Sequence, residues 1–409
     1  MRRRRLIFAA AVMGPGVVVM LADSDVGSLI TAAQSGSAWG YRMVAPQLLL
    51  IPVLYLVQEM TLRLGMVTGK GHGALIAEHF GHRWAMLSAA TLVISATGAL
   101  TTEFAGVAGV GEIFGLSPVL TVPVAVVALI GIATTGSYRR AERIGIVLGL
   151  TELAFFPALV MAHPNPSALA VGLMHAPLGN SSYLFLLAAN VGAVIMPWMI
   201  FYQQGAVVDK GLRPRDIAME RRDTAVGAIL TQLIMIAMVV LFAAALARRH
   251  GGVNLGTVGE MSAVLTPILG RVAGRVLLGI AILGAALVAS LVASVASSWG
   301  LAEVFGWDHT LNERPDRRTA KFYGVFVMTH LLGAGLVLAS VNLVGLAIDV
   351  EVANAMLLPV VLGFLLVLEA RALPPEYRMR GLRRTLTTGA SVATMGFGLF
   401  IAARLLLVW

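Results

Sequence analysis

Residues 25–28 read DVGS and lie inside the first long apolar stretch of the chain. Residues 196–198 read MPW and interrupt a second apolar stretch in a similar way. A carboxylate, a glycine or a proline at membrane depth is costly unless the freed backbone lines a cavity. Two unwound segments at corresponding positions of two halves are the best sequence indication of a transporter's binding site.

The composition is that of a polytopic membrane protein. Of the 409 residues, 58% are hydrophobic and 12% are charged, whereas a soluble domain has about 25% charged residues. The chain therefore forms a single transmembrane domain, residues 1–409, without room for a large soluble one. Cysteine is absent, which excludes disulfides and thiolate metal sites. Arg2–Arg5 precede an apolar run that Asp23 and Asp25 interrupt, so we expect a retained first helix and not a cleaved signal peptide.

Hydrophobic runs of about 20 residues or more predict eleven transmembrane helices. Their approximate limits are residues 8–35, 43–64, 85–114, 117–136, 142–162, 183–208, 223–247, 271–301, 321–345, 348–370 and 385–408.

The net charge of +9 follows the membrane topology. Most Lys and Arg residues fall in alternate connections between the spans, which are cytoplasmic if the N-terminus is cytoplasmic. We therefore expect a multi-pass protein of the plasma (inner) membrane, with the N-terminus in the cytoplasm and the C-terminus outside. Nucleic acid is not an expected partner.

The order of the spans predicts an internal repeat. Residues 8–162 and 183–370 each contain five spans, and each set opens with a broken helix. An odd number of spans inverts the second copy, so the fold class is all-α with inverted five-helix repeats and an extra helix at 385–408.

Several motifs together resemble the NRAMP divalent-metal transporters. The chain has GPG at 14–16, DVGS at 25–28 and QSG at 34–36, where that family has GPG, DPGN and QAG at the same spacing. GAVIMPW at 192–198 looks like the family's GAxxMPH, and the resemblance covers nearly the whole chain.

The resemblance implies a LeuT-type fold with spans one and six broken, and transport of a divalent cation. It also implies a metal site made by Asp25, Ser28, the Ala193 carbonyl and Met196. The metal is then the substrate, no cofactor is expected, the protein is not an enzyme, and a monomer in the lipid bilayer is the expected form.

The chain departs from the family at informative positions. Val26 replaces a proline, Ser28 an asparagine and Trp198 a histidine; Leu100 replaces an aspartate, while Glu103 keeps the family's glutamate. The missing histidine and aspartate belong to the family's proton route, so tight proton coupling is in doubt. These changes make the chain resemble the divergent, NRAMP-related magnesium transporters.

Further residues join the candidate pathway. Gly27 permits an unwound backbone. Asp23 has two open interpretations: it lines an outer vestibule and attracts cations, or it has a structural role in helix capping or an ion pair. Glu351 and Asn354 in the tenth span suit a hydrated hard cation, because Mg²⁺ is usually held through waters by one or two carboxylates.

The remaining buried carboxylates and histidines are expected to be structural or polar-network residues. Glu59 and Glu103 match family positions and are predicted to join internal polar networks. Glu152 is expected to be structural, and His72 is expected to lie in a solvated cytoplasmic loop.

With the resemblance, the sequence favours a transporter that imports a divalent cation by alternating access, with weak or no proton coupling and with Mg²⁺ favoured over Mn²⁺. Met196 favours Mn²⁺ or Fe²⁺, since a thioether binds soft metals and contributes little to Mg²⁺, whereas Ser28, Trp198 and Glu351 favour Mg²⁺. The alternative is a conventional proton-coupled Mn²⁺/Fe²⁺ transporter.

Two other classes fit the sequence less well. An organic-cation or amino-acid carrier on the same fold would have to accommodate Asp25. An intramembrane protease would need HExxH or GxSxG, and neither motif occurs.

Overall fold

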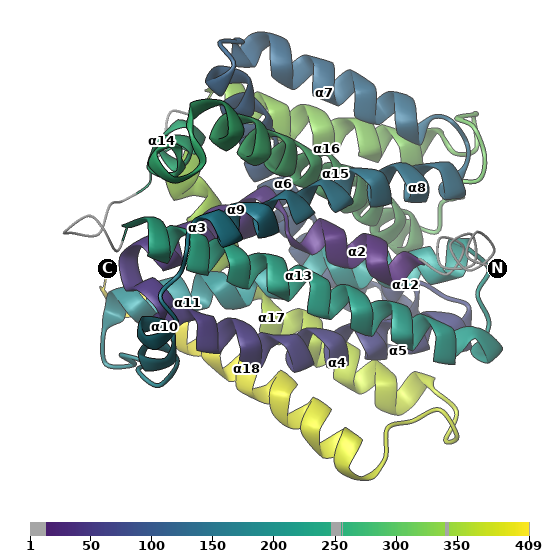
Figure 1. Ribbon diagram of the computed structural model, residues 1–409. Helices are drawn as coiled ribbons and strands as arrows, with labels where there is room; N and C mark the ends of the chain where they lie inside the picture. Colours follow the sequence, from purple (N-terminus) through teal and green to yellow (C-terminus); the bar gives the residue numbers. More distant parts are fainter. Residues whose placement is uncertain (1–13, 247–254, 256, 340–342, 409) are drawn as a thin grey trace, which may run out of the picture.

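The computed structural model describes residues 14–246, 255, 257–339 and 343–408, and every regular element in these ranges is helical (Figure 1). Arg2–Arg5 and the first residues of the span expected at 8–35 lie outside the described residues. The first half contains α2 (Pro15–Asp23), α3 (Val26–Trp39), η1 (Gly40–Met43), α4 (Val44–Thr68), α5 (His72–Phe80), α6 (His82–Ile113), α7 (Pro118–Ala133), α8 (Tyr138–Gly149), η2 (Leu150–Ala154), α9 (Phe155–Met161) and α10 (Pro166–Leu173).

The second half is built in the same way. It contains α11 (Ser181–Val194), α12 (Pro197–Asp209), η3 (Pro214–Asp216), α13 (Ile217–Leu246), α14 (Val258–Leu269), α15 (Arg271–Phe305), α16 (Ala320–Ala339), α17 (Leu343–Ala372) and α18 (Gly381–Val408).

The helices agree with the spans expected from the sequence. Nine helical stretches of the described chain are long and apolar enough to cross a membrane, and the first of them, Val26–Thr68, contains parts of two expected spans. The shorter α7, with 16 residues, fills another expected span. The short helices α5, α10 and α14 were not anticipated, because they lie outside the long apolar runs.

Both expected helix breaks are present. Ser24 and Asp25 separate α2 from α3, and Ile195 and Met196 separate α11 from α12. Pro197 starts α12 because proline lacks the N–H that a helix interior needs. The two broken helices run in opposite directions through the molecule (Figure 1), as inverted repeats require.

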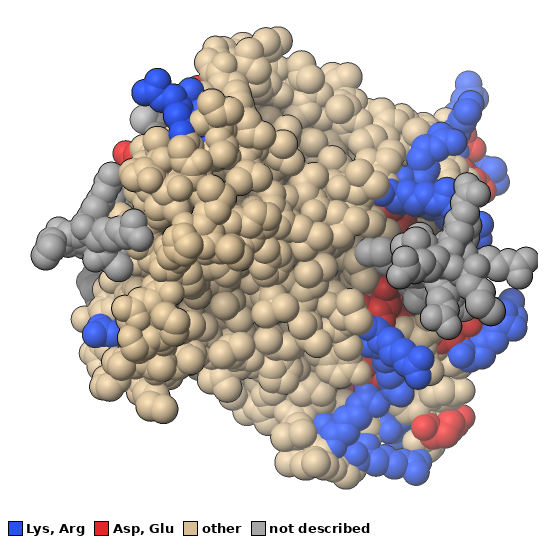
Figure 2. All heavy atoms as spheres, viewed as in Figure 1, with Lys and Arg blue, Asp and Glu red and all other residues tan. Residues whose placement is uncertain are grey.

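Lys and Arg gather at one end of the molecule, and the surface between the two ends is almost free of charge (Figure 2). We call this the basic end; α2 and α12 lie on its side of the breaks (Figure 1). Lys70 and Lys210 follow the ends of α4 and α12, and Arg371 lies in the last turn of α17. One basic end beside an apolar band is the charge pattern of a membrane protein, and we predict from it that this end is cytoplasmic.

An ionic cluster ties four helices together at the basic end. Glu59 of α4 is 1% exposed and pairs with Arg63 at 3.3 Å, with Arg221 of α13 at 2.8 Å and with Arg383 of α18. Arg63 also reaches Glu369 of α17 at 2.9 Å. Glu59 therefore belongs to an internal polar network at the basic end, where three guanidinium groups already neutralise it.

The N-terminus of α2 is held by carboxylates of another helix. Asp223 of α13 accepts hydrogen bonds from the Gly14 and Val17 N–H groups, both at 3.0 Å, and Glu220 accepts one from Gly16 at 3.1 Å. The first N–H groups of a helix have no partner within it, and negative charge is favoured there. The short helix α2 is therefore fastened to α13 at the basic end.

His72 corrects an expectation from the sequence, because it is buried at the start of α5 and does not lie in a solvated loop. Its Nδ1 lies 3.2 Å from Oε1 of Gln204 in α12, and its ring stands edge-on to Phe201. Burial lowers the pKa of His72 from 6.5 to about 4, and the hydrogen bond to Gln204 opposes this only in part. The imidazole is therefore neutral and connects α5 to α12.

The contact between α2 and α13 can be tested with a single introduced thiol, since the chain has no cysteine. We expect Asp223→Ala to raise the reactivity of a cysteine placed at the buried position Val18. Each lost hydrogen bond to a charged group weakens the contact by about 1.5–3 kcal/mol. The half-buried Asp216→Ala is the control. Equal labelling rates of the Val18 cysteine in the Asp223→Ala and Asp216→Ala variants would contradict the fastening role.

His72 predicts a pH dependence of stability. Because its pKa is lower in the folded state, its contribution is complete above pH 6.5 and is lost as the pH falls towards 4. Between pH 7 and pH 5 the free energy of unfolding therefore falls by about 2 kcal/mol because of His72. We expect His72→Gln to flatten the dependence of the unfolding temperature on pH in this window. The exposed His79→Gln on the same helix should leave the dependence as in wild type.

Candidate metal site

The two carboxylate oxygens of Asp25 differ: one caps a helix, and the other has no hydrogen-bond partner among the described residues. Asp25 is fully buried, and its Oδ1 accepts the Ser28 N–H at 2.7 Å, which caps α3. Its Oδ2 makes no hydrogen bond within the described part of the chain. A buried carboxylate oxygen without a donor needs a cation, a proton or water as its partner. The helix cap and the candidate ligand are thus two oxygens of one side chain.

Ser28 joins the two helix breaks. Its hydroxyl donates to the Ala193 carbonyl at 2.9 Å. That carbonyl is free because the residue four positions later is Pro197, which has no N–H. The bond brings α3 and α11 together where both helices are interrupted. Ser28 and Ala193 therefore lie beside Asp25, and each oxygen keeps a lone pair for a ligand.

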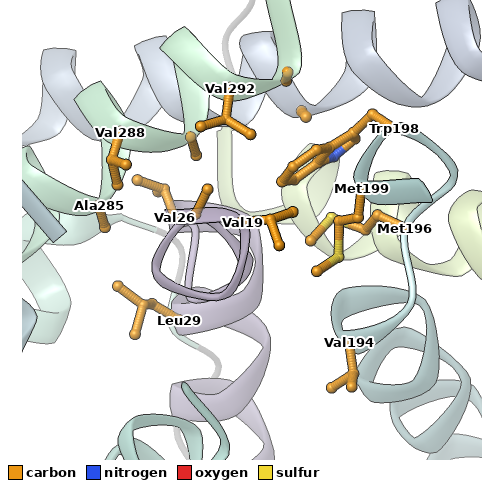
Figure 3. Close-up of a cluster of buried hydrophobic side chains, with 14 of the residues drawn as sticks. Val19, Val26, Leu29, Val194, Met196, Trp198, Met199, Ala285, Val288 and Val292 are labelled. Carbon is orange, nitrogen blue, oxygen red and sulfur yellow. The ribbon is translucent and has the colours of Figure 1, made fainter. Parts of the chain in front are cut away.

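Met196 and Trp198 face an apolar cluster. Figure 3 shows Met196, Trp198 and Met199 on the side of Val19 of α2, with Val292 of α15 nearby. Both Met196 and Trp198 are fully buried, and the Trp198 indole N–H has no hydrogen-bond partner among the described residues. Trp198 thus fills a space between three helices.

Glu351 of α17 approaches the first break from another side. A Cβ placed on Gly27 would lie 2.3 Å from Glu351 Oε1, so only glycine leaves room for this carboxylate. Asn354 donates to Glu351 Oε2 at 3.0 Å and accepts from Ser95 of α6 at 2.7 Å. This chain of hydrogen bonds orients Glu351, whose Oε1 has no partner within the described residues.

Glu103 of α6 holds the same break in place. Its Oε2 accepts the Val26 N–H at 3.2 Å, and its Oε1 accepts from the Thr102 hydroxyl at 3.3 Å. Glu103 therefore belongs to an internal polar network. Ser95 and Thr102 were missed by the sequence analysis, because a serine or threonine in an apolar helix carries no signal of its partner.

Asp23 does not line an open vestibule. It is 1% exposed at the end of α2, and its Oδ2 accepts from Thr231 of α13 at 3.3 Å. Its Oδ1 has no hydrogen-bond partner among the described residues.

The site is acidic and lacks fixed positive charge. None of the ion pairs formed by described residues involves Asp25, Glu103 or Glu351. Within the same part of the chain no three His, Asp or Glu side chains are arranged to hold a metal together. An ion bound here would be coordinated by few side chains together with backbone carbonyl or water oxygens. Such partial coordination suits reversible binding.

The chain is similar to several known proteins. It is 27% identical over 279 residues to the divalent metal cation transporter MntH of Aeromonas hydrophila and 28% identical over 276 residues to MntH of Yersinia pestis. These alignments cover 65% and 64% of this chain, and the chain spans 67% and 66% of the two relatives.

Solved structures show the same fold at low sequence identity. The Eremococcus coleocola manganese transporter aligns over 95% of this chain and 85% of its own, with a TM-score of 0.78 and 16% identity. MhsT in complex with L-phenylalanine aligns over 95% and 97%, with a TM-score of 0.66 and 13% identity. The LeuT-type fold expected from the sequence resemblance is thereby confirmed.

The family model described as natural resistance-associated macrophage protein-like matches residues 16–403, which include both helix breaks and almost all described helices. The chain therefore belongs to the Nramp family.

Proposed function

We propose that this chain is a secondary transporter that imports a divalent metal cation by alternating access. The observation that carries the proposal is the pair of open carboxylate oxygens, Asp25 Oδ2 and Glu351 Oε1, buried where two broken helices meet. A buried charge without a partner is expensive, and a divalent cation that binds and leaves would compensate it transiently.

The similar proteins support the same substrate class. Their names describe divalent metal cation transport and, for the structure, manganese transport. They are metal transporters and not enzymes, and metal is their substrate. We propose that this chain likewise acts in the plasma membrane as a monomer, with no cofactor, with the basic end and N-terminus in the cytoplasm and the C-terminus outside.

We favour Mg²⁺ over Mn²⁺ as the transported ion. Glu351 adds a second carboxylate beside Asp25, and Ser28 offers a hydroxyl; such oxygen ligands suit a hard ion that keeps part of its water. Met196 shares the apolar cluster of Val19 and Trp198, which accounts for its presence through packing (Figure 3).

We also propose weak or absent proton coupling. Leu100 is buried against α16, where a Cβ on Gly333 would lie 2.7 Å from its Cβ, so no carboxylate stands at that position. A divalent ion gains about 4.6 kcal/mol from an inside-negative potential of about 100 mV, which is more than a thousandfold accumulation. The alternative, a proton-coupled Mn²⁺/Fe²⁺ transporter, is favoured by the retained Glu103 and Met196.

Removal of the Asp25 charge tests the site. Asp25→Asn keeps an oxygen for the cap of α3 but removes the negative charge, so we expect uptake to fall at least tenfold, by about 10–100-fold. Mg²⁺ and Mn²⁺ entry into proteoliposomes with a negative-inside potential would be followed with internal dyes, and internal pH in parallel. The matched control is the exposed Asp349→Asn of α17.

The outcomes of this experiment separate the alternatives. Saturable Mg²⁺ uptake without acidification, lost in Asp25→Asn and retained in Asp349→Asn, would support an uncoupled magnesium carrier. Mn²⁺ uptake with acidification and without Mg²⁺ flux would show a proton-coupled manganese transporter. Unchanged uptake of both ions in Asp25→Asn would refute the site.

Met196 tests the ion preference. Met196→Leu removes the thioether and conserves side-chain volume, so folding should be affected by less than about 1.5 kcal/mol. If Met196 only packs, the ratio of Mn²⁺ to Mg²⁺ uptake stays as in wild type, which we expect. A selective loss of Mn²⁺ uptake would instead make the sulfur a metal ligand and favour the transition-metal alternative.

A further inference from the structure

A second pair of carboxylates lies on the other side of the first helix break and has no role in the site above. Asp23 and Glu152 are 1% and 0% exposed. Asp23 Oδ1 and both oxygens of Glu152 make no hydrogen bond within the described residues. Three buried carboxylate oxygens without a donor are an expensive arrangement for a purely structural pair.

The packing of α8 against α2 places Glu152 beside the break. A Cβ on Gly145 would lie 3.7 Å from Val18, and one on Gly149 would lie 2.6 Å from Leu21. Followed one turn further, both segments bring η2, with Glu152, towards Ser24 at the break. The Ser24 hydroxyl and the carboxylates of Asp25 and Asp23 lie within electrostatic range of Glu152.

Helix α13 adds a further oxygen from the opposite side. The Thr231 hydroxyl lies 2.6 Å from the Ser24 hydroxyl and donates to Asp23 Oδ2 at 3.3 Å. Asp23, Ser24, Thr231 and Glu152 thus form one cluster drawn from three elements, α2 with its break, η2 and α13. We call these four residues the inner oxygen cluster.

The electrostatics of the inner oxygen cluster favour a cation. The ion pairs of the described residues include neither Asp23 nor Glu152. The cluster also lies at the C-terminal end of α2, where the carbonyl groups of the last turn point outwards and carry partial negative charge. A positive ion would satisfy the carboxylates and the helix end together.

All side-chain donors of the inner oxygen cluster are oxygens, and no thioether is among its four residues. Carboxylate and hydroxyl oxygens suit hard cations such as Mg²⁺ or Na⁺.

We propose that Asp23, Ser24, Thr231 and Glu152 form a second site, for a hard cation held by oxygen ligands alone, adjacent to the Asp25 site. An ion in this site would tie the end of α2 to η2 and α13. The proposal goes beyond the transport function, because it concerns a bound ion whether or not that ion is carried. It also gives Glu152, expected to be structural, a ligand role.

Direct binding to the full chain in lipid nanodiscs tests the proposal. Bound Mg²⁺ would be counted by equilibrium dialysis with elemental analysis, and bound Na⁺ in a separate arm with the radioactive ion. The variants are Asp25→Ala, which removes the transport-site carboxylate, Glu152→Gln, and the two combined. Glu112→Gln, at the far end of α6, is the matched control.

We expect Asp25→Ala to retain one bound ion in one of the two arms. Adding Glu152→Gln should weaken that binding at least tenfold, by about 10–100-fold, and Glu112→Gln should not. Loss of all binding in Asp25→Ala alone, or unchanged binding in the double variant, would overturn the second site. If Glu152→Gln does not fold, Thr231→Val removes one hydroxyl ligand and carries the same expectation.

Failure of the transport proposal would look different. Normal uptake by Asp25→Asn would refute the transport site and would leave the number of Glu152-dependent ions unaffected. The second site is judged only from ion binding that depends on Glu152 or Thr231.

Discussion

The rest of the structure depends on one constraint: a backbone N–H or C=O group without a hydrogen-bond partner is costly in an apolar environment. Two helices stop near the middle of the bundle, and each stop leaves N–H and C=O groups that lipid cannot satisfy. Asp25 caps one of them, and the Ser28 hydroxyl reaches the carbonyl that Pro197 leaves free. The two breaks meet, and the Ser28 hydroxyl satisfies the free Ala193 carbonyl while the Ser28 N–H satisfies one oxygen of Asp25.

The surrounding helices hold this meeting point through small residues. A Cβ on Gly192 would lie 1.7 Å from the Glu351 carbonyl, and a Cβ on Gly27 would reach the Glu351 side chain. Glycine at these positions lets α17 approach both α11 and α3. The close approach delivers a carboxylate to the first break, and the hydrogen bond from Asn354 orients it. The same close helix packing therefore also sets the position of the Glu351 carboxylate.

The buried charged groups follow the same rule, that a buried polar group needs a partner. At the basic end, Glu59 is neutralised by arginines, and the N–H groups of α2 are neutralised by Glu220 and Asp223. Around the break, Asp25, Glu351 and Glu152 keep oxygens without a donor among the described residues. The contrast separates carboxylates that hold the fold together from carboxylates for which we propose a cation as the partner, although all of them are buried.

The sequence by itself determined the membrane class, the spans and both helix breaks, because hydrophobic length and a proline or aspartate within it are local properties. It also placed Asp25, Ser28 and Ala193 together through the family resemblance. Only the tertiary structure decided that Glu59 belongs to an ionic cluster, that His72 is buried and that Glu152 faces Ser24. Each of those outcomes depends on a partner from a distant helix, and a pattern along one segment contains no information about which side chain will lie opposite it.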